Sequence, residues 1–467
     1  MRYYFLGIAG TAMASLAALL KQKGHQVWGS DQGIYPPMSD FLVEQGIPVW
    51  SGYAEAHLEQ PFDQVVIGNS LSRGNVEVEA ILNRRLPFVS LPELIRREFI
   101  DSHCNIVITG THGKTTTTAL MCWILETAGL SPTFLIGGIA RNFDSSIQLG
   151  SGKYFVIEGD EYDCAFFDKR PKFAHYFPDY LIINNLEFDH ADIYPNLDAI
   201  KDVFRKLLRI VPGEGLVVAN AESPAVREVL QPAHSRLQRF GRAPENEWSY
   251  GILGKTAQET RFEIREKGKS AGEFRFPFPG EYQLENALAA SAVARDLGVG
   301  WETIGQALAT FRGVKRRLEY WGRLHGAEVY DDFAHHPTAI RVTLEAMKEK
   351  FPANRLVALF EPRTNTTVRK VFQKELCEAL AIAEVVILTP IFRLERLPEG
   401  ERLSPEKLLQ DLRGQGKTVF ALADYAQIPE TLQQTLREGD ILVLLTNGSL
   451  GGEYQRLRGA LETAGEP

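Results

Sequence analysis

The sequence is poor in cysteine and lacks long apolar runs. Its four cysteines, Cys104, Cys122, Cys164 and Cys377, lie far apart and form no CxxC pair. This spacing excludes a disulfide framework or a cysteine-ligated zinc site and indicates buried thiols in a reducing compartment. No apolar run approaches the length that spans a bilayer, and residues 1–10 predict a strand and a glycine turn rather than a signal peptide. We therefore expect a cytoplasmic protein without a membrane partner.

The charge balance excludes another class of partner. The chain has 51 Lys and Arg against 59 Asp and Glu, a net charge of -8 without a basic stripe, so the electrostatic footprint of a nucleic-acid-binding protein is missing. Its hydrophobic (44%) and charged (24%) fractions are typical of a soluble globular protein. A chain of 467 residues is too long for one core and predicts about two to four domains. The sequence shows no internal repeat and gives no oligomeric state.

The stretch 109–120, TGTHGKTTTTAL, carries the clearest chemical pattern. A β-like apolar run precedes it, and apolar residues at helical spacing follow it. In a phosphate-binding loop, main-chain N–H groups surround phosphate oxygens, a lysine adds charge, and a Ser or Thr reaches Mg²⁺; Lys114 and Thr115 fit the last two roles. The usual loop has four residues between its glycines, whereas only two separate Gly110 and Gly113. A solvated glycine turn with capping threonines is therefore the alternative.

The beginning of the chain predicts a βαβ unit. A strand at 2–6 enters a turn that contains Gly10, and a later strand delivers Ser30 and Asp31 to its end. An acidic residue about 20 positions after a glycine turn can bind ribose hydroxyls. Because the glycines do not complete GxGxxG, a dinucleotide, a nucleotide-sugar and a purely structural turn all fit this pattern.

Polar clusters follow three further predicted strands. EGDEYD begins at Glu158, NNLEFDHAD covers 184–192, and DDFAHHP begins at Asp331. In α/β sheets, ligands bind outside the carboxyl ends of the strands, where such clusters lie. Carboxylates also suit Mg²⁺, which binds through one or two of them together with substrate phosphates. One cluster alone is more often a helix cap or a solvated turn, but two clusters after a GKT loop favour a metal site.

Strands alternate with helices along the whole chain, which favours the α/β class with mostly parallel sheets. We expect three domains. They are a Rossmann-like domain over 1–102, a central domain with the phosphate loop over 103–315, and a second Rossmann-like domain over 316–467.

Taken together, these motifs resemble those of the Mur ligase family of ATP-dependent amide-forming enzymes. The resemblance covers essentially the whole chain through GIAGTAM, GSD, GTHGKTTTTA, EGDEYD, NNLEFDHADIY, GVKRRLE and DDFAHHPTAI. The shortened loop GTHGKT is itself the family form. The resemblance implies that the first domain binds a UDP-sugar, the central domain ATP, and the third domain the amine substrate, with ATP and Mg²⁺ as cofactors.

Longer strings favour one branch of this family. GNSLSRGN, AFFDKRPKFAHY and EPRTNT are similar to members that join UDP-N-acetylmuramate to the murein tripeptide L-alanyl-γ-D-glutamyl-meso-diaminopimelate in peptidoglycan recycling. The alternative is a member that adds L-alanine to the same UDP-sugar, which usually reads QPHRYTR where this chain has EPRTNTT. A catalytically inactive nucleotide-binding relative is a third alternative, disfavoured because the family's functional residues are present together.

The family reaction forms an acyl phosphate that an amine attacks, and both steps need charge neutralised more than a protein nucleophile. The resemblance implies catalytic roles for Lys114, Glu158, His190 and Arg317, and Mg²⁺ contacts for Thr115, Glu158 and His190. A neutral imidazole is an uncommon Mg²⁺ ligand, so a helix cap is the structural alternative for His190. The implied ATP contacts are Gly110, Thr111, His112, Gly113, Lys114, Thr115, Thr116, Asn286, Arg317 and Asp332.

The resemblance also implies contacts for the other two substrates. Arg363, Thr364 and Asn365 would bind the peptide, since an arginine can pair bidentately with a carboxylate; a solvated loop is the alternative. The diphosphate would lie at the first helix N-terminus. The implied UDP-sugar contacts are Gly10, Thr11, Ala12, Ser30, Asp31, Asn69, Ser70 and Arg73.

The chain departs from the family pattern at one site segment. Where His-Asn-x-x-Asn is usual, this chain has Tyr282 and Gln283 followed by Asn286, and the longer glutamine leaves the adenine contact on that side open. Several members carry a carbamylated lysine after the second-metal histidine, but Lys201 and Lys206 are not in clear register with it.

Overall fold

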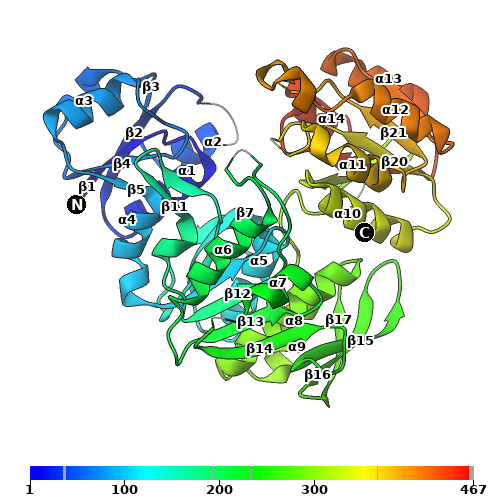
Figure 1. Ribbon diagram of the computed structural model, residues 1–467, viewed down its shortest axis with the longest axis horizontal. Helices are drawn as coiled ribbons and strands as arrows, with labels where there is room; N and C mark the ends of the chain where they lie inside the picture. Colours follow the sequence, from blue (N-terminus) through cyan, green and yellow to red (C-terminus); the bar gives the residue numbers. More distant parts are fainter. Residues whose placement is uncertain (35–37, 192, 232, 365, 393, 462–467) are drawn as a thin grey trace.

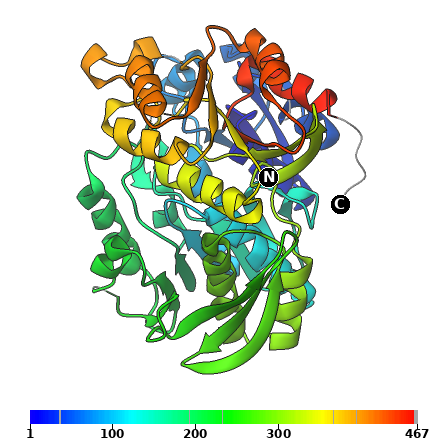
Figure 2. The ribbon, with the colours of Figure 1, turned by 90° about the vertical axis from the view of Figure 1, so that its right-hand side faces the viewer.

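The computed structural model describes residues 1–34, 38–191, 193–231, 233–364, 366–392 and 394–461. They fold into three α/β units, with the first and third units above the central one in the view of Figure 1 and again in Figure 2, which is turned by 90°. The main sheets have five, ten and six strands. This confirms the expected class and the three-domain organisation. The sheets lie within 1–102, 103–315 and 316–467, which we retain as proposed domain limits.

The first domain is a parallel sheet in the order β3-β2-β1-β4-β5. The strand order reverses between β1 and β4, which creates a switch point where α/β sheets bind ligands. The strands are β1 (Arg2–Leu6), β2 (Gln26–Asp31), β3 (Val49–Ser51), β4 (Gln64–Ile67) and β5 (Phe88–Ser90), and the helices are α1 (Thr11–Gln22), α2 (Met38–Glu44), α3 (Val76–Arg84) and α4 (Leu91–Glu98).

The central sheet is mixed, in the order β17-β16-β15-β14-β13-β12-β6-β9-β7-β8. Its middle strands are parallel and are buried on both faces, which explains their continuous apolar sequences. The antiparallel strands β15–β17 form a ribbon at the far edge (Figure 1). A small hairpin of β10 and β11 forms a separate sheet.

The elements of the central domain are as follows. The strands are β6 (Cys104–Thr109), β7 (Thr133–Ala140), β8 (Ser145–Gln148), β9 (Tyr154–Glu158), β10 (Asp163–Ala165), β11 (Asp168–Pro171), β12 (Tyr180–Ile183), β13 (Leu216–Asn220), β14 (Arg236–Gly241), β15 (Trp248–Lys255), β16 (Thr260–Glu266) and β17 (Lys269–Phe276). The helices are α5 (Lys114–Thr127), α6 (Leu197–Leu208), α7 (Pro224–Val229), α8 (Glu281–Asp296) and α9 (Trp301–Thr310).

The third domain has a sheet in the order β18-β19-β23-β20-β21-β22, in which β18 runs antiparallel to β19 and the other pairs are parallel. Its strands are β18 (Glu319–Leu324), β19 (Ala327–Asp332), β20 (Leu356–Phe360), β21 (Val385–Leu388), β22 (Thr418–Ala421) and β23 (Ile441–Leu445). Its helices are α10 (Pro337–Lys350), α11 (Gln373–Leu380), α12 (Pro405–Gly414), α13 (Ile428–Thr435) and α14 (Glu453–Gly459). Among the described residues of the whole chain, every helix is too short or too polar to cross a bilayer.

A buried carboxylate holds one side of the first domain together. Glu77 in α3 is 0% exposed. It accepts hydrogen bonds from the Tyr4 hydroxyl (2.9 Å), the Ser30 hydroxyl (2.8 Å) and the Ala54 main-chain N–H (2.9 Å), and His57 Nδ1 lies 2.7 Å from it. A buried ionised carboxylate is tolerated only when its oxygens are satisfied in this way.

The substitution Glu77→Gln tests this network. The amide has the same shape, but its NH₂ group would face a hydrogen-bond donor, so we expect a loss of about 2–3 kcal/mol of unfolding free energy. Urea denaturation followed by tryptophan fluorescence measures the change. The matched control is Glu79→Gln on the same helix, because Glu79 pairs with Arg73 at the surface and should change stability by less than about 1 kcal/mol. Equal effects of the two substitutions would contradict the assignment.

Candidate active site

One cavity of about 580 Å³ lies where the three domains meet. The first domain contributes the start of α1 and the end of β4, and the central domain contributes the loop after β6 and the ends of β7 and β9. The third domain contributes residues 332–336 and one face of α10. Polar groups from the carboxyl ends of several parallel strands therefore converge on one cavity, as expected for a ligand site in α/β proteins.

The loop 110–113 has the shape of a phosphate-binding loop despite its short length. Gly110 has φ +127°, and a Cβ there would lie 3.0 Å from the main-chain N and O of Asn185. Gly113 has φ +81°, and a Cβ there would lie 2.6 Å from Asn286 Oδ1. Helix α5 begins directly afterwards, at Lys114, so its free N–H groups point at the cavity where an anion would bind. The backbone therefore favours glycine at both positions, which supports the phosphate-loop interpretation over a solvated turn.

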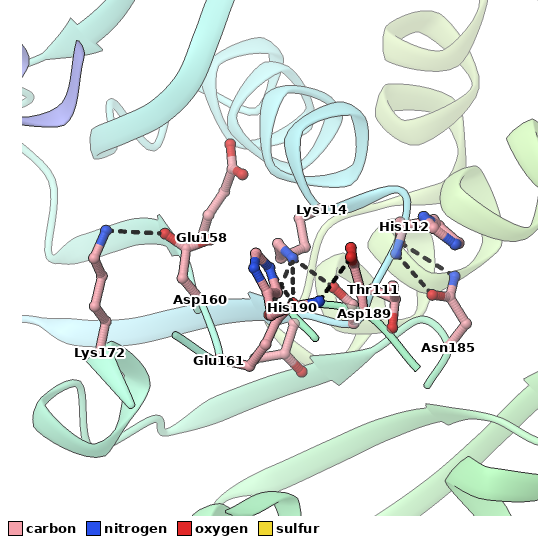
Figure 3. A network of polar contacts seen from close by, with 12 residues as sticks. Thr111, His112, Lys114, Glu158, Asp160, Glu161, Lys172, Asn185, Asp189 and His190 are labelled. Carbon is pink, nitrogen blue, oxygen red and sulfur yellow. Dashed lines mark hydrogen bonds and ion pairs between the residues drawn. The ribbon is translucent and has the colours of Figure 1, made fainter. Parts of the chain in front are cut away.

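The loop after β12 braces the phosphate loop. Asn185 accepts hydrogen bonds from the main-chain N–H of Thr111 (through its carbonyl, 3.1 Å) and of His112 (through Oδ1, 2.7 Å). It also donates from Nδ2 to the His112 carbonyl at 3.2 Å. Glu187 N–H donates to the Thr111 hydroxyl at 2.9 Å. Because β6 and β12 are parallel neighbours, the two loops leave the same sheet edge and interlock (Figure 3).

Charged groups gather around Lys114 at the centre of the cavity (Figure 3). Lys114 Nζ donates to the Gly110 carbonyl at 2.7 Å and lies 3.1 Å from Glu161 Oε2. Burial works to lower the pKa of Lys114, but Glu161, Asp160 and Glu158 outweigh it and the pKa is raised. Burial likewise works to raise the pKa of Glu161, and Lys114 and His190 lower it overall. The site therefore holds a charged lysine ready to meet phosphate.

Glu158 and Thr115 form a pair of oxygen donors beside this lysine. The Thr115 hydroxyl donates to Glu158 Oε2 at 3.0 Å, and Gly137 N–H donates to Oε1 at 2.6 Å. Burial and the neighbouring Asp160 carboxylate raise the pKa of Glu158. The ionised form of Glu158 thus lacks sufficient positive charge nearby, and a hard cation would supply it. Oxygen donors of this kind fit Mg²⁺.

His190 faces the same centre in a strained conformation. Its φ is +53°, uncommon for a residue with a side chain, and its Nε2 lies 3.4 Å from Glu161 Oε1. Burial works against protonation of His190, but Glu161 and Asp189 raise its pKa. The alternative role of helix cap is wrong, because α6 begins later and is capped by the side chain of Asn196.

The remaining proposed ATP contacts line the cavity on the side of α8 and the third domain. Asn286 Oδ1 accepts a hydrogen bond from the Thr117 hydroxyl at 3.1 Å, and Gln283 Oε1 accepts from Asn286 Nδ2 at 3.5 Å. Gln283, where the chain departs from the family pattern, therefore contacts Asn286 and lines the cavity beside it. Asp332 accepts from the main-chain N–H groups of Leu318 and Ala334, both at 2.8 Å. Arg317 Nη2 lies 3.5 Å from the Thr115 hydroxyl and so bridges toward the phosphate loop.

The structure brings some proposed UDP-sugar contacts to the cavity and leaves others away from it. Ser30 donates its hydroxyl to the buried Glu77, and Asp31 accepts from the main-chain N–H groups of Ala9 (2.9 Å) and Gly33 (3.0 Å). Arg73 points to solvent, 68% exposed, and pairs with Glu79 at 2.8 Å. These three residues are outside the cavity wall in the described structure, so Ser30 and Asp31 shape the first glycine turn. Those that line the cavity are Gly10, Thr11, Ala12, Asn69 and Ser70.

The proposed peptide contacts lie beside the cavity rather than in its wall. Arg363 has its guanidinium 3.9 Å from the centre of the Phe392 ring and Nη1 3.5 Å from Glu361 Oε1. The Thr364 hydroxyl donates to the His335 carbonyl at 3.5 Å, and His335 does line the cavity. Asn365 lies outside the described residues. Lys201, one of the two lysines considered for the carbamylated position, pairs with Asp198 and Glu228 away from this region.

Several site residues were missed by the sequence reasoning. Glu161, Asn185 and His335 stand inside the motifs EGDEYD, NNLEFDHAD and DDFAHHP but were given no role. Their position directly after strands was the available signal. For His335, burial lowers the pKa to about 4, and its Nδ1 lies 2.9 Å from the Phe333 carbonyl. Its ring is therefore neutral and held in one orientation at the cavity wall.

Comparison with known proteins agrees with this geometry. Three family models match successive parts of the chain: "Mur ligase family, catalytic domain" over 2–100, "Mur ligase middle domain" over 108–294, and "Mur ligase, glutamate ligase domain" over 316–448. The UDP-N-acetylmuramate--L-alanyl-gamma-D-glutamyl-meso-2,6-diaminoheptandioate ligase of Escherichia coli is 40% identical over 100% of this chain and 99% of its own length. The chain belongs to the Mur ligase family. It is an ATP-dependent ligase that forms an amide bond.

Relatives of two kinds resemble this Mur ligase. The UDP-N-acetylmuramate--L-alanine ligase of Geobacter sp. is 33% identical over 98% of this chain and 97% of its own length. Among solved structures, the murein peptide ligase of Psychrobacter arcticus has a TM-score of 0.76 at 34% identity and covers 100% of both chains. The UDP-N-acetylmuramate-alanine ligase of Thermotoga maritima has a TM-score of 0.81 at 25% identity and covers 98% of both chains.

The substitution Gly113→Ala tests the phosphate loop of this Mur ligase. A Cβ would meet Asn286 Oδ1 in a conformation that side chains disfavour, so we expect nucleotide affinity to fall by about tenfold or more, a loss above 1.4 kcal/mol. Fluorescence titration with a labelled ATP analogue measures it. Gly129→Ala is the matched control at the other end of α5, with φ +70° and nothing within 4 Å of its Cβ. The control should lose about 1 kcal/mol of stability and bind nucleotide normally. Undiminished nucleotide binding by Gly113→Ala would contradict this reading of the loop.

Proposed function

We propose that this Mur ligase joins UDP-N-acetylmuramate to the tripeptide L-alanyl-γ-D-glutamyl-meso-diaminopimelate. The observation that carries the proposal is the full-length identity, 40% to the tripeptide ligase of Escherichia coli against 33% to the L-alanine ligase of Geobacter sp.. The TM-scores run in the opposite order, 0.76 and 0.81. A score over three linked domains also depends on how the domains are oriented. Identity is therefore the better guide to the amine substrate.

The arrangement of the cavity supports the assignment of substrates to domains. Gly10–Ala12 at the start of α1 would face the diphosphate of the UDP-sugar, because a helix N-terminus presents free N–H groups. The phosphate loop would hold ATP between the central and third domains, with Asn286 on the base side and Asp332 near the ribose. Arg363 and Thr364, beside His335, remain the proposed peptide contacts at the edge of the cavity.

The residues of the chain fit a reaction through an acyl phosphate. A carboxylate of the UDP-sugar would take the γ-phosphoryl group of ATP, and the peptide amine would then attack the acyl carbon and release phosphate. Lys114 and Arg317 would neutralise the phosphate charge, which is the main requirement of phosphoryl transfer. Enclosure by three domains would exclude water from the acyl phosphate, which hydrolysis would otherwise destroy.

Mg²⁺ fits the oxygen donors on the same wall. We propose that Thr115 and Glu158 hold one ion, consistent with the raised pKa of Glu158. A second ion would lie near His190, with Glu161 as the neighbouring oxygen donor. Bound Mg²⁺ supplies additional positive charge to the phosphate oxygens. The protein contributes by fixing Glu158 through Gly137 N–H and the Thr115 hydroxyl.

The choice of amine is the first test. The protein is incubated with ATP, Mg²⁺ and UDP-N-acetylmuramate, and phosphate release is compared for the tripeptide and for L-alanine. We expect faster release with the tripeptide, at about tenfold or more in kcat/KM, equivalent to 1.4 kcal/mol of transition-state binding. Faster release with L-alanine would favour the alanine ligase instead. No release with either amine would favour an inactive nucleotide-binding relative.

The substitution Lys114→Ala tests the role of the phosphate loop in turnover. Removal of a fixed charge at the phosphoryl group should lower kcat by about 10²–10³-fold or more, while calorimetric binding of UDP-N-acetylmuramate stays within about twofold, or 0.4 kcal/mol. The matched control is Lys169→Ala, because Lys169 pairs with Asp163 at the surface and lies outside the cavity wall. Equal loss of turnover and of UDP-sugar binding in Lys114→Ala would argue against separate sites.

A further inference from the structure

A second cluster of metal-binding side chains lies beside the phosphate loop. It contains His112 of that loop, Glu187 of the loop after β12, and His336 at the start of α10. His112 Nε2 lies 3.2 Å from Glu187 Oε2, and His336 Nδ1 lies 3.5 Å from the same oxygen. All three donor atoms lie within 4.8 Å of one another. The cluster is separate from Thr115, Glu158 and His190, and it joins the central domain to the third.

The Nδ1 lone pair of His336 faces the carboxylate and accepts one long hydrogen bond, from the main-chain N–H of Thr338 at 3.3 Å. Its Nε2 lies 3.1 Å from the Phe188 carbonyl, which only accepts hydrogen bonds, so the proton of a neutral ring is on Nε2. Burial lowers the pKa of His336 to about 4, so the ring is neutral near pH 7. Nδ1 and Glu187 Oε2 are then two acceptors 3.5 Å apart without a proton between them. A cation between these atoms would satisfy both.

The distances match those in a coordination sphere. Ligand bonds of about 2.0–2.1 Å in tetrahedral geometry separate neighbouring donor atoms by about 3.3 Å. The two measured edges, 3.2 and 3.5 Å, are close to this value. The third edge, between the two imidazoles, is no longer than 4.8 Å. The carbonyl of Phe188 orients His336, just as a carbonyl or carboxylate that accepts from the other ring nitrogen orients a metal-bound histidine.

We propose that His112, Glu187 and His336 form a binding site for a transition-metal ion of the Zn²⁺ type. Two imidazoles and one carboxylate are poor ligands for Mg²⁺, which prefers oxygen, and good ligands for Zn²⁺, Co²⁺ or Ni²⁺. An ion here would connect the phosphate loop directly to the start of α10. It would hold the third domain against the central one and fix the ring of His112.

One existing contact would change on metal binding. The main-chain N–H of Thr338 donates to His336 Nδ1 at 3.3 Å and caps the first turn of α10. This distance is long for a hydrogen bond, and the metal would take over the lone pair. Besides the two histidines, the Glu187 carboxylate contacts the Thr338 side chain, which donates a hydrogen bond to it. By contrast, the cluster of Cys164, Asp168 and His175 already has Arg170 2.8 Å from its carboxylate, which disfavours a second cation there.

Cobalt uptake tests the proposal without any measurement of activity. The full chain, free of nucleotide and in a large excess of Mg²⁺, is titrated with Co²⁺ while its visible absorption is recorded. We expect one Co²⁺ for each chain and an absorption band that Zn²⁺ abolishes. Glu187→Gln and His336→Gln should each weaken binding by about 100-fold or more. His25→Gln is the matched control, because His25 also lies 3.1 Å from a carboxylate, that of Glu98, but has no second imidazole; it should bind normally.

Three outcomes would overturn the proposal. The first is an absence of Co²⁺ uptake by the unmodified chain. The second is uptake that Glu187→Gln and His336→Gln leave unchanged. The third is uptake that is lost in His190→Gln but retained in Glu187→Gln, which would place the ion in the proposed Mg²⁺ site. Thermal unfolding of each variant without metal separates loss of the site from loss of the fold.

Discussion

The close approach of Gly110 to the main chain of Asn185 is the constraint on which the active site depends. Any side chain at Gly110 would meet main-chain atoms at 3.0 Å, and main-chain atoms cannot rotate away. The loop between the two glycines is too short to hold its own shape through internal contacts. Asn185 holds it from outside, by bonding to Thr111 and His112. The phosphate loop is therefore shaped before any nucleotide binds.

The positions of the charged side chains in the cavity depend on the phosphate loop held by Asn185. Lys114 is fixed at the Gly110 carbonyl, and from there it meets Glu161. Glu161 in turn faces His190, whose strained φ of +53° turns it toward the centre. On the other side, Glu158 is held by two donors yet keeps a raised pKa. Burial makes each of these charges costly by itself, so the group is balanced for the arrival of phosphate and a cation together.

The sequence was most informative where strands are buried on both faces. The apolar runs 2–6, 64–67, 88–90, 180–183, 356–360 and 441–445 predict strands, and β1, β4, β5, β12, β20 and β23 have these bounds. Continuous apolar runs are clear signals in parallel sheets. The sequence does not predict the separate strands of the ribbon β15–β17, since polar antiparallel strands at the edge of a sheet have a weak hydrophobic pattern. The alanine-rich run 286–297 predicts a helix from Asn286, whereas α8 begins five residues earlier, at Glu281, after Gly280 with φ +91°. The start was missed because Tyr282 and Gln283 are not typical opening residues.

Side-chain direction accounts for the predicted UDP-sugar contacts that lie outside the cavity wall. Position at the end of β2 was predicted for Ser30 and Asp31, but successive side chains in a strand point to opposite faces. Ser30 points to Glu77, a partner 47 positions away in sequence, and Asp31 points to the glycine turn. Arg73 lies outside the cavity wall for a different reason, because its local partner Glu79 holds it at the surface. Spacing within a motif identifies the loop, whereas contacts with residues outside the motif decide which side chains line the cavity.

The segment between the central and third domains shows how the cavity depends on domain orientation. Val314 pairs with Ala140 at the end of β7 and so extends the central sheet. Arg316 and Leu318 then adopt φ of +62° and +48°, which for residues with side chains costs about 1–2 kcal/mol each. Asp332 holds this turn through Leu318 N–H and also lines the cavity. Because one carboxylate of the third domain supports both the turn and the cavity wall, a change in domain orientation must also move Arg317 relative to the phosphate loop.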